Sequence, residues 1–213
     1  LAVLCSGVGS NFHAILKATK DQSLRAEVVV LAVDRPEAGA VSIAQTHQID
    51  IVYRAQSGKR RERDLDLAQQ LQPFQPDLIV LAGYMRVLSA AFIDRFQTQW
   101  LTHDLTSVQL SRIINIHPLL PLQYPGINAV KQAIDDNATL TGVTVHVVDE
   151  GVDTGPILDQ DRVNVGVGET VCSLQQRIKK VEHRLLPAVL TNIEMSGFNI
   201  LLDNTGFSVK NGS

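Results

Sequence analysis

Short apolar blocks and longer mixed blocks alternate along the first half of the chain. The compact apolar runs favour buried strands over residues 1–5, 26–33, 51–54, 77–82 and 112–116. The blocks between them carry apolar residues at helical spacing and predict helices over residues 11–20, 36–47, 59–71 and 89–96. Strands and helices that alternate in this way predict an α/β protein with a doubly wound, mostly parallel sheet and helices on both faces.

The second half of the chain alternates less regularly. Its patterns predict a helix, two strands and a long last helix over residues 127–135, 142–148, 156–165 and 170–195. We expect Pro187 to kink that last helix, because proline cannot donate the hydrogen bond that a helix interior needs. Residues 97–111 have weak periodicity, which predicts a long loop.

The length of 213 residues makes one domain the expectation. We place this domain over residues 1–195 and treat residues 196–213 as a C-terminal extension. Within the extension, the turn sequence Asp-Asn-Thr-Gly at 203–206 predicts a small hairpin over residues 198–209.

The composition narrows the class of protein. With 45% hydrophobic and 19% charged residues, the chain is typical of a globular protein in water. Its net charge of −3 gives no electrostatic case for binding nucleic acid, and no apolar run approaches the roughly 20 residues of a membrane span. Cys5 and Cys172 lie far apart, outside any metal-binding or redox spacing, and Cys5 is expected to be a buried thiol. We therefore expect a reducing compartment, the cytoplasm.

An amide and an imidazole end the strand predicted over 112–116. Asn115 and His117 are two residues apart, so they project from the same face of the strand, and Pro118 ends the strand's hydrogen bonding. Such a pair suits a carbonyl group that must become an oxyanion. The alternative is that Asn115 caps a turn and His117 is a hydrogen-bonded core histidine.

An acidic loop follows the strand predicted over 142–148. Residues 149–156 carry three carboxylates and two glycines. A carboxylate next to His117 would raise the pKa of the imidazole and hold it as a cation. The alternative is an ordinary solvated acidic turn, and for His146, just before this loop, we expect a structural role.

A glycine-rich loop, Ser-Gly-Val-Gly-Ser-Asn at 6–11, joins the first strand to the first helix. Backbone N–H groups at a helix start attract anions, which favours a phosphate site. Phe12 stands where a dinucleotide fingerprint needs its third glycine, and the Gly-Lys-Ser/Thr of a P-loop is absent. A nucleotide-dependent oxidoreductase remains an alternative function, because Asp34 follows the second strand. Another alternative is that the 6–11 loop is only a tight turn that caps the helix.

These loops are expected to share one rim of the sheet. The 6–10 loop, the 83–88 loop and His117 each follow a predicted strand. In doubly wound sheets, ligands bind at the carboxyl ends of the strands.

Six segments occur in the order in which one known family carries them. They are Ser-Gly-Val-Gly-Ser-Asn at 6–11, Leu-Ala-Gly-Tyr-Met-Arg-Val-Leu at 81–88, Asn-Ile-His-Pro at 115–118, Tyr-Pro-Gly at 124–126, Thr-Gly-Val-Thr-Val-His at 141–146 and Asp-Thr-Gly-Pro at 153–156. Each motif is weak alone. Together they resemble the phosphoribosylglycinamide formyltransferases, a family of folate-dependent formyltransferases, over residues 1–195.

The resemblance implies formyl transfer from 10-formyltetrahydrofolate to the amine of 5'-phosphoribosylglycinamide, in purine biosynthesis. It implies catalytic roles for Asn115, His117 and Asp153. On the ribonucleotide side it implies Gly9, Ser10, Asn11, Lys179 and Glu182, and on the folate side Arg60, Met85, Arg86, Val87, Leu88 and Val148. It further implies a formyl-folate co-substrate without a metal, small-molecule partners, no nucleic acid or membrane, and a monomer or homodimer.

Three departures from the family pattern stand out. The family usually reads His-Pro-Ser-Leu-Leu-Pro, but here residues 117–123 read His-Pro-Leu-Leu-Pro-Leu-Gln. Val8 replaces a residue that is often polar, and the segment 97–111 is longer than usual. The first departure leaves the path of the chain after His117 open.

Other functions remain open from the sequence. A surface ion pair is the simpler interpretation of Lys179 and Glu182, three residues apart on one helix. A formyltetrahydrofolate hydrolase would use water as acceptor, and a methionyl-tRNA formyltransferase would use an aminoacylated tRNA. A further alternative is a binding protein that keeps the fold without catalysing the reaction.

Overall fold

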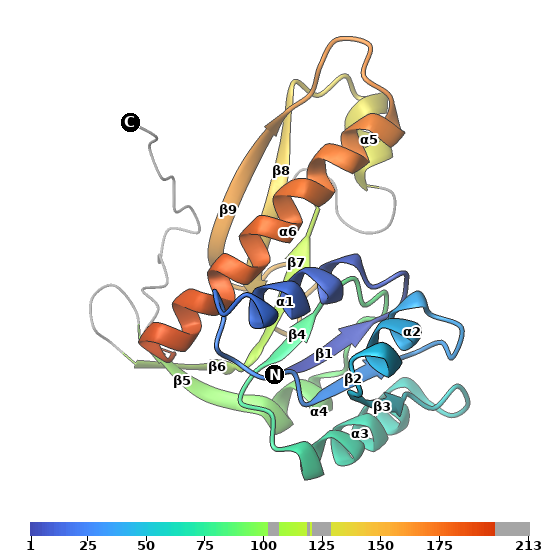
Figure 1. Cartoon of the computed structure of the whole chain (residues 1–213), viewed down its shortest axis with the longest axis vertical. Coiled ribbons are helices and arrows are strands. Elements are labelled where there is room, and N and C mark those ends of the chain that lie inside the picture. The colour runs from blue at the N-terminus through green and yellow to red at the C-terminus, as the bar shows by residue number, and fades with distance from the viewer. Residues whose placement is uncertain (102–106, 119, 121–128, 199–213) are drawn as a thin grey trace.

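The computed structural model describes residues 1–101, 107–118, 120 and 129–198. Seven strands form one sheet, which helices flank (Figure 1). Their spatial order is β3-β2-β1-β4-β7-β8-β9. In chain order the strands are β1 Ala2–Cys5, β2 Val30–Val33, β3 Asp50–Tyr53, β4 Ile79–Leu81, β7 Ile113–His117, β8 Leu140–Val147 and β9 Ile157–Asn164.

The first five strands of that order run parallel, and β8 and β9 add two antiparallel strands at one edge. The chain winds from β1 outward to β3, then returns to the other side of β1 through β4. The carboxyl ends of β1 and β4 therefore flank the point where the winding reverses, which is where such sheets bind ligands. The predicted mostly parallel, doubly wound sheet is confirmed.

Helices cover both faces of the sheet. They are α1 Ser10–Lys20, α2 Gly39–Thr46, α3 Arg60–Leu71, α4 Ala90–Ile93, α5 Ala129–Asp135 and α6 Val171–Ser196, with short 3-10 turns at Gln72–Phe74 and Asp94–Phe96. One apolar core lies under α1, α2 and α6, and the other lies under α3 and α4. Neighbouring residues of β1 alternate between these cores, Val3 facing the first and Leu4 the second. This burial on both faces explains the uninterrupted apolar runs of the inner strands.

Most predicted elements are present, with shifted ends. The strand predicted over 26–33 is confined to Val30–Val33, because β2 pairs with β1 only over Ala2–Cys5. Pro187 lies inside α6, and the kink expected there stays a prediction. The hairpin predicted over 198–209 lies outside the described residues apart from Phe198, as do residues 127–128 of the helix predicted over 127–135.

The prediction of a loop over 97–111 is wrong. The segment contains an antiparallel pair, β5 Gln97–Leu101 and β6 Ser107–Ser111. Trp100 pairs with Val108, and its fully buried indole donates a hydrogen bond to the Ser111 carbonyl at 3.1 Å. The period-two pattern of these two strands rests on four residues on one face, Thr98, Trp100, Val108 and Leu110. The glutamines and serines between them obscure this pattern in the sequence.

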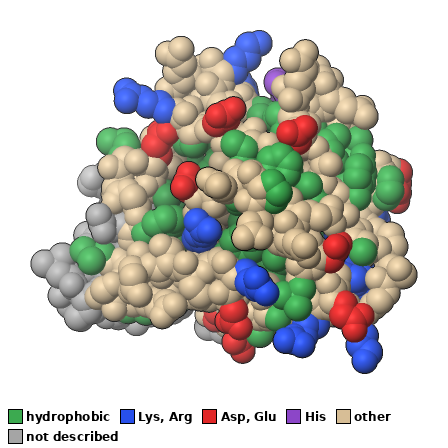
Figure 2. All heavy atoms as spheres, turned by 90° about the horizontal axis from the view of Figure 1, so that it is seen from below, with side chains coloured by type: hydrophobic (Ala, Val, Ile, Leu, Met, Phe, Trp, Pro, Cys, Tyr) green, Lys and Arg blue, Asp and Glu red, His purple; other side chains and the backbone are tan. Residues whose placement is uncertain are grey.

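The distribution of surface charge and the state of the two cysteines agree with the expectations from composition. On the face seen in Figure 2, basic and acidic side chains are interspersed rather than gathered by sign. Within the described part of the chain, no helix is long and apolar enough to cross a membrane. Cys5 and Cys172 are free thiols, and burial raises the pKa of Cys5 to about 12.

Candidate active site

A cavity of about 550 Å³ opens at the carboxyl ends of β1, β4 and β7. Its walls come from the β1–α1 loop, the loop after β4, the end of β7, the loop after β8 and one face of α6. The single rim predicted from the sequence is therefore present. All but one of the predicted site residues line this cavity: Gly9, Ser10, Asn11, Met85, Arg86, Val87, Leu88, Asn115, His117, Val148, Asp153, Lys179 and Glu182.

The three predicted catalytic side chains meet at the centre of the cavity. Asn115 Nδ2 donates a hydrogen bond to Asp153 Oδ1 at 3.2 Å. His117 Nδ1 lies 3.6 Å from Asp153 Oδ2, an ion pair when the imidazole is protonated. The interpretation of Asn115 as a turn cap and His117 as a core histidine therefore does not hold.

Asp153 reaches this position through an uncommon backbone conformation. Its φ is 56°, in the left-handed region that aspartate tolerates better than most residues. A hydrogen bond from His146, together with the nearby His117 and Asn115, holds the pKa of Asp153 below its ordinary value against the opposing effect of burial. The carboxylate is therefore charged throughout the neutral pH range.

His146, for which a structural role was expected, is a fourth member of the cluster. It is buried on β8 and pairs with Asn115 across the sheet, with Nε2 3.2 Å from Asn115 Nδ2 and 3.5 Å from Asp153 Oδ1. Its Nδ1 lies 3.0 Å from the Val147 carbonyl, which can only accept, so Nδ1 carries a proton. Nε2 then accepts from Asn115 when the ring is neutral, or donates to Asp153 when it is charged.

The acidic loop is folded so that Asp153 faces inward. Asp149 accepts hydrogen bonds from the backbone N–H of Gly151 at 3.0 Å and from the Thr154 hydroxyl at 2.8 Å. At Gly155 an added Cβ would lie 1.8 Å from the Val147 carbonyl oxygen, so only glycine fits. The loop is thus tied within itself and pressed against the end of β8 at Gly155, while Glu150, Val152 and Thr154 remain exposed.

The β1–α1 loop and α6 form one end of the cavity. Gly9 has a φ of 78° and precedes α1, and an added Cβ there would lie 2.9 Å from the Cα of Ala40. Asn11 Nδ2 donates to Glu182 Oε2 at 3.1 Å, and Asn11 Oδ1 has no partner among the described residues. A helix start with an unsatisfied amide oxygen beside it is suited to a phosphorylated ligand that also carries donors.

Glu182 is not part of a simple surface ion pair. It is only 7% exposed, and burial raises its pKa despite the hydrogen bond from Asn11 and the nearby Lys179. Lys179 is exposed and lines the same cavity three residues earlier on α6. The helix therefore presents a cation and a buried carboxyl group to this end of the cavity.

The loop after β4 forms the other end. Met85 and Val87 are exposed, Met85 by 63%, while Leu88 is buried beneath them. Exposed apolar side chains that line a cavity suit a flat, partly apolar ligand. Val148 joins this wall from the end of β8.

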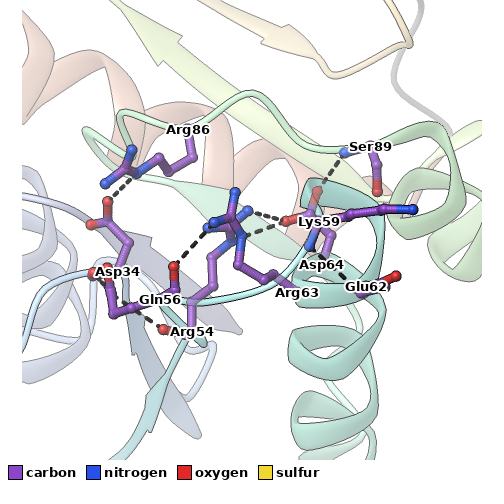
Figure 3. Close-up of polar contacts among 9 residues, drawn as sticks. All are labelled: Asp34, Arg54, Gln56, Lys59, Glu62, Arg63, Asp64, Arg86 and Ser89. Atoms are coloured by element: carbon purple, nitrogen blue, oxygen red, sulfur yellow. Dashed lines mark hydrogen bonds and ion pairs between the residues drawn. The ribbon is translucent and has the colours of Figure 1, made fainter.

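Two residues singled out from the sequence lie outside the cavity. Arg60 is exposed at the start of α3 and does not line it, so its expected role on the folate side stays a prediction. Asp34 does not line it either, and its carboxylate accepts a hydrogen bond from Arg86 Nε at 2.6 Å (Figure 3). This carboxylate is therefore not presented to a ribose in the cavity. The feature that supported an oxidoreductase as an alternative function is thus removed.

Comparisons with known proteins agree with this geometry. A family model described as formyl transferase matches residues 1–190. Phosphoribosylglycinamide formyltransferase of Bacillus subtilis is 34% identical over 194 residues, 90% of this chain and 93% of that protein. The protein of the same name from Mycobacterium tuberculosis is 36% identical over 203 residues, 94% of this chain and 87% of that protein.

A solved structure supports the same relationship in three dimensions. The crystal structure of phosphoribosylglycinamide formyltransferase from Bacillus halodurans superposes with a TM-score of 0.83 at 35% identity, covering 97% of this chain and 98% of that one. The sequence match spans the β1–α1 loop, the loop after β4, the end of β7, the acidic loop and most of α6. The chain therefore belongs to the formyl transferase family.

Proposed function

We propose that this chain transfers the formyl group of 10-formyltetrahydrofolate to the amine of 5'-phosphoribosylglycinamide, a step of purine biosynthesis. The observation that carries the proposal is the position of Asn115, His117 and Asp153 between two unlike ends of one cavity. The names of the relatives described above support transfer of a formyl group to the same acceptor.

The two ends of the cavity suit the two substrates. The end formed by Gly9, Ser10, Asn11, Lys179 and Glu182 offers helix N–H groups and a cation for the phosphate, and polar groups for the rest of the ribonucleotide. The end with Met85, Arg86, Val87, Leu88 and Val148 offers apolar surface for the pterin ring. Two substrates bound end to end place amine and formyl group together, and this proximity lowers the barrier.

In the proposed reaction the ribonucleotide amine attacks the formyl carbon, and the formyl oxygen gains negative charge. Asn115 donates a hydrogen bond to that oxygen, and protonated His117 stabilises its charge. In the resting cluster the Asn115 amide is directed at Asp153 and His146, so the formyl oxygen takes over one of these hydrogen bonds. Losing one such donor costs about 3 kcal/mol of barrier.

Asp153 supports the proton transfers of the same reaction. Its carboxylate stays ionised and lies 3.6 Å from His117, which favours the imidazolium form and fixes the ring's orientation. The attacking amine must lose a proton and the leaving folate nitrogen must gain one. We propose that His117 and Asp153 relay this proton through water, so that no covalent intermediate with the protein forms.

The co-substrate is expected to act without a metal. Among the described residues, no group of three or more His, Cys, Asp or Glu is arranged to hold a metal ion. Adding a chelator to the assay tests this expectation, because a metal-dependent reaction would slow.

The deciding experiment mixes the protein with 10-formyltetrahydrofolate, with and without 5'-phosphoribosylglycinamide, and follows deformylation of the folate. Turnover that requires the ribonucleotide supports the transferase. Turnover without it indicates a hydrolase, and no turnover in either mixture indicates a binding protein. Formylation of an aminoacylated tRNA is measured in parallel, although the net charge of −3 does not favour that substrate.

A further inference from the structure

Three neighbouring parallel strands each end in a buried polar residue. Ser6 follows β1, Asp34 follows β2 and Arg54 follows β3, and their side chains are 5%, 1% and 5% exposed. Polar groups this deeply buried require hydrogen-bond partners. All three direct their side chains toward the loop that follows the fourth strand, β4, or toward a residue that binds it.

We call residues 83–89 the donor-side loop, because Met85, Val87 and Leu88 form the apolar end of the cavity. Its first half is attached to Ser6. The Ser6 backbone N–H donates to the Gly83 carbonyl at 3.1 Å, and the Met85 N–H donates to the Ser6 hydroxyl oxygen at 2.8 Å. These two bonds fix the point at which the chain leaves β4.

The middle of the donor-side loop is attached to Asp34. Arg86 Nε donates to Asp34 Oδ2 at 2.6 Å, and the carboxylate is almost completely buried while the Arg86 side chain is 44% exposed (Figure 3). The other carboxylate oxygen, Oδ1, has no partner among the described residues. Arg86 therefore supplies the hydrogen bond on which this buried charge depends.

The far end of the donor-side loop is attached through Asp64 of α3. The Ser89 backbone N–H donates to Asp64 Oδ2 at 2.8 Å, just before α4 begins. Asp64 Oδ1 accepts two hydrogen bonds from Arg54, from Nε at 2.9 Å and from Nη2 at 2.6 Å. Asp64 is 0% exposed, so α3 and β3 hold the end of the loop through a buried ion pair (Figure 3).

From this arrangement we propose that Asp34 and Asp64, with Arg54 and Ser6, are positioning residues for the formyl donor. They fix the start, middle and end of the donor-side loop without lining the donor's end of the cavity themselves. The inference rests on the proposed function, since it assigns that loop to the folate. It predicts that loosening the loop weakens donor binding and leaves ribonucleotide binding at the opposite end unchanged.

A role in overall stability alone would give a different result. Buried ion pairs contribute little net stability compared with apolar residues of the same size, although removing one partner is costly. A purely structural role would lower the melting temperature and leave the Michaelis constants of the surviving folded protein alike for both substrates. A positioning role changes one Michaelis constant and not the other.

The test uses Asp34→Asn, which keeps the shape of the side chain and removes its charge. The hydrogen bond between two charged groups becomes one in which only Arg86 is charged, which is weaker. We expect the KM and the Kd for 10-formyltetrahydrofolate to rise about tenfold, with the KM for the ribonucleotide within twofold of wild type. Asp64→Asn is the second variant, with the same expected direction and a larger effect.

Asp161→Asn is the matched control. It makes the same chemical change at an exposed ion pair with Arg184, on β9 and away from the cavity. Its donor KM should equal that of wild type. Melting temperatures of all variants distinguish an effect on folding from an effect on donor binding. If Asp64→Asn does not fold, the result for Asp34→Asn decides the test.

The outcomes separate the two proposals. If wild type turns over and Asp34→Asn shows an unchanged donor KM, or an equal rise in both Michaelis constants, the positioning role is overturned and the proposed function stands. If wild type neither turns over nor binds 10-formyltetrahydrofolate in a direct titration, both proposals fall.

Discussion

Replacing Asp153 with asparagine tests the centre of the proposed mechanism. The substitution keeps the shape of the side chain, and asparagine tolerates the left-handed backbone conformation, with φ of 56°, as aspartate does. What it removes is the negative charge 3.6 Å from His117 Nδ1. Two unit charges at that separation attract by about 4–5 kcal/mol at an effective dielectric constant of about 20.

If that attraction stabilises the imidazolium in the transition state, its loss slows turnover about 1,000-fold, since about 1.4 kcal/mol corresponds to a factor of ten. The assay is deformylation of 10-formyltetrahydrofolate at saturating ribonucleotide, with the ribonucleotide Kd measured separately by titration. We expect the Kd to change less than threefold, because Gly9, Asn11 and Glu182 lie at the end of the cavity formed by α1 and α6.

Glu150→Gln provides the control for this experiment. Glu150 lies in the same loop, is exposed and does not line the cavity, so the variant loses the same charge without contacting His117. Its turnover should match wild type. Turnover of Asp153→Asn within tenfold of wild type would refute the ion-pair argument and remove Asp153 from the mechanism.

Three further outcomes follow from contacts in and around the cavity. Glu182→Gln should raise the KM for the ribonucleotide about tenfold and leave that for the folate unchanged, because Glu182 is buried against Asn11. Gly155→Ala should lower turnover about 100-fold, since its Cβ would lie 1.8 Å from the Val147 carbonyl oxygen and must displace the acidic loop. Because the folded-state pKa of Asp153 is lowered, its contribution to stability is present above its unfolded pKa near 3.8 and is lost as the pH falls through the lowered value. Urea unfolding at pH 7, 5 and 3 should therefore show Asp153→Asn less stable than wild type at the first two, with a smaller difference at pH 3.

The sequence predicts the sheet well because its inner strands are buried on both faces. The uninterrupted apolar runs at β1, β2 and β4 are typical of buried strands and of few other elements. The helices between them carry apolar residues at clear helical spacing. The β5–β6 pair was missed because its buried face is short and interleaved with glutamine and serine. A period of two over so few residues is easily obscured, and only the burial of Trp100 makes it visible.

Within one strand the sequence also predicts which side chains share a face. Asn115 and His117 are two residues apart on β7, and both line the cavity as expected. The resemblance to a known family supplied Asp153, whose inward orientation depends on Gly155 and on hydrogen bonds to Asp149 that no local pattern reveals. Burial of Glu182 could not be foreseen either, because it depends on α6 packing against α1.

The place of His146 in the cluster could not be predicted from the sequence alone. His146 enters the cluster because β8 runs antiparallel to β7 in the one register that places it opposite Asn115. A shift of one residue would turn its ring to the other face of the sheet and bring a valine, Val145 or Val147, to the same position. Over residues 143–147 valines alternate with Thr144 and His146, which predicts that His146 faces away from the valines. A shift of two residues would keep these faces, so the pattern does not say which residue of β7 lies opposite His146. The cross-strand neighbours of a proposed catalytic residue are therefore set by tertiary packing, which here places His146 Nε2 3.2 Å from the Asn115 amide nitrogen.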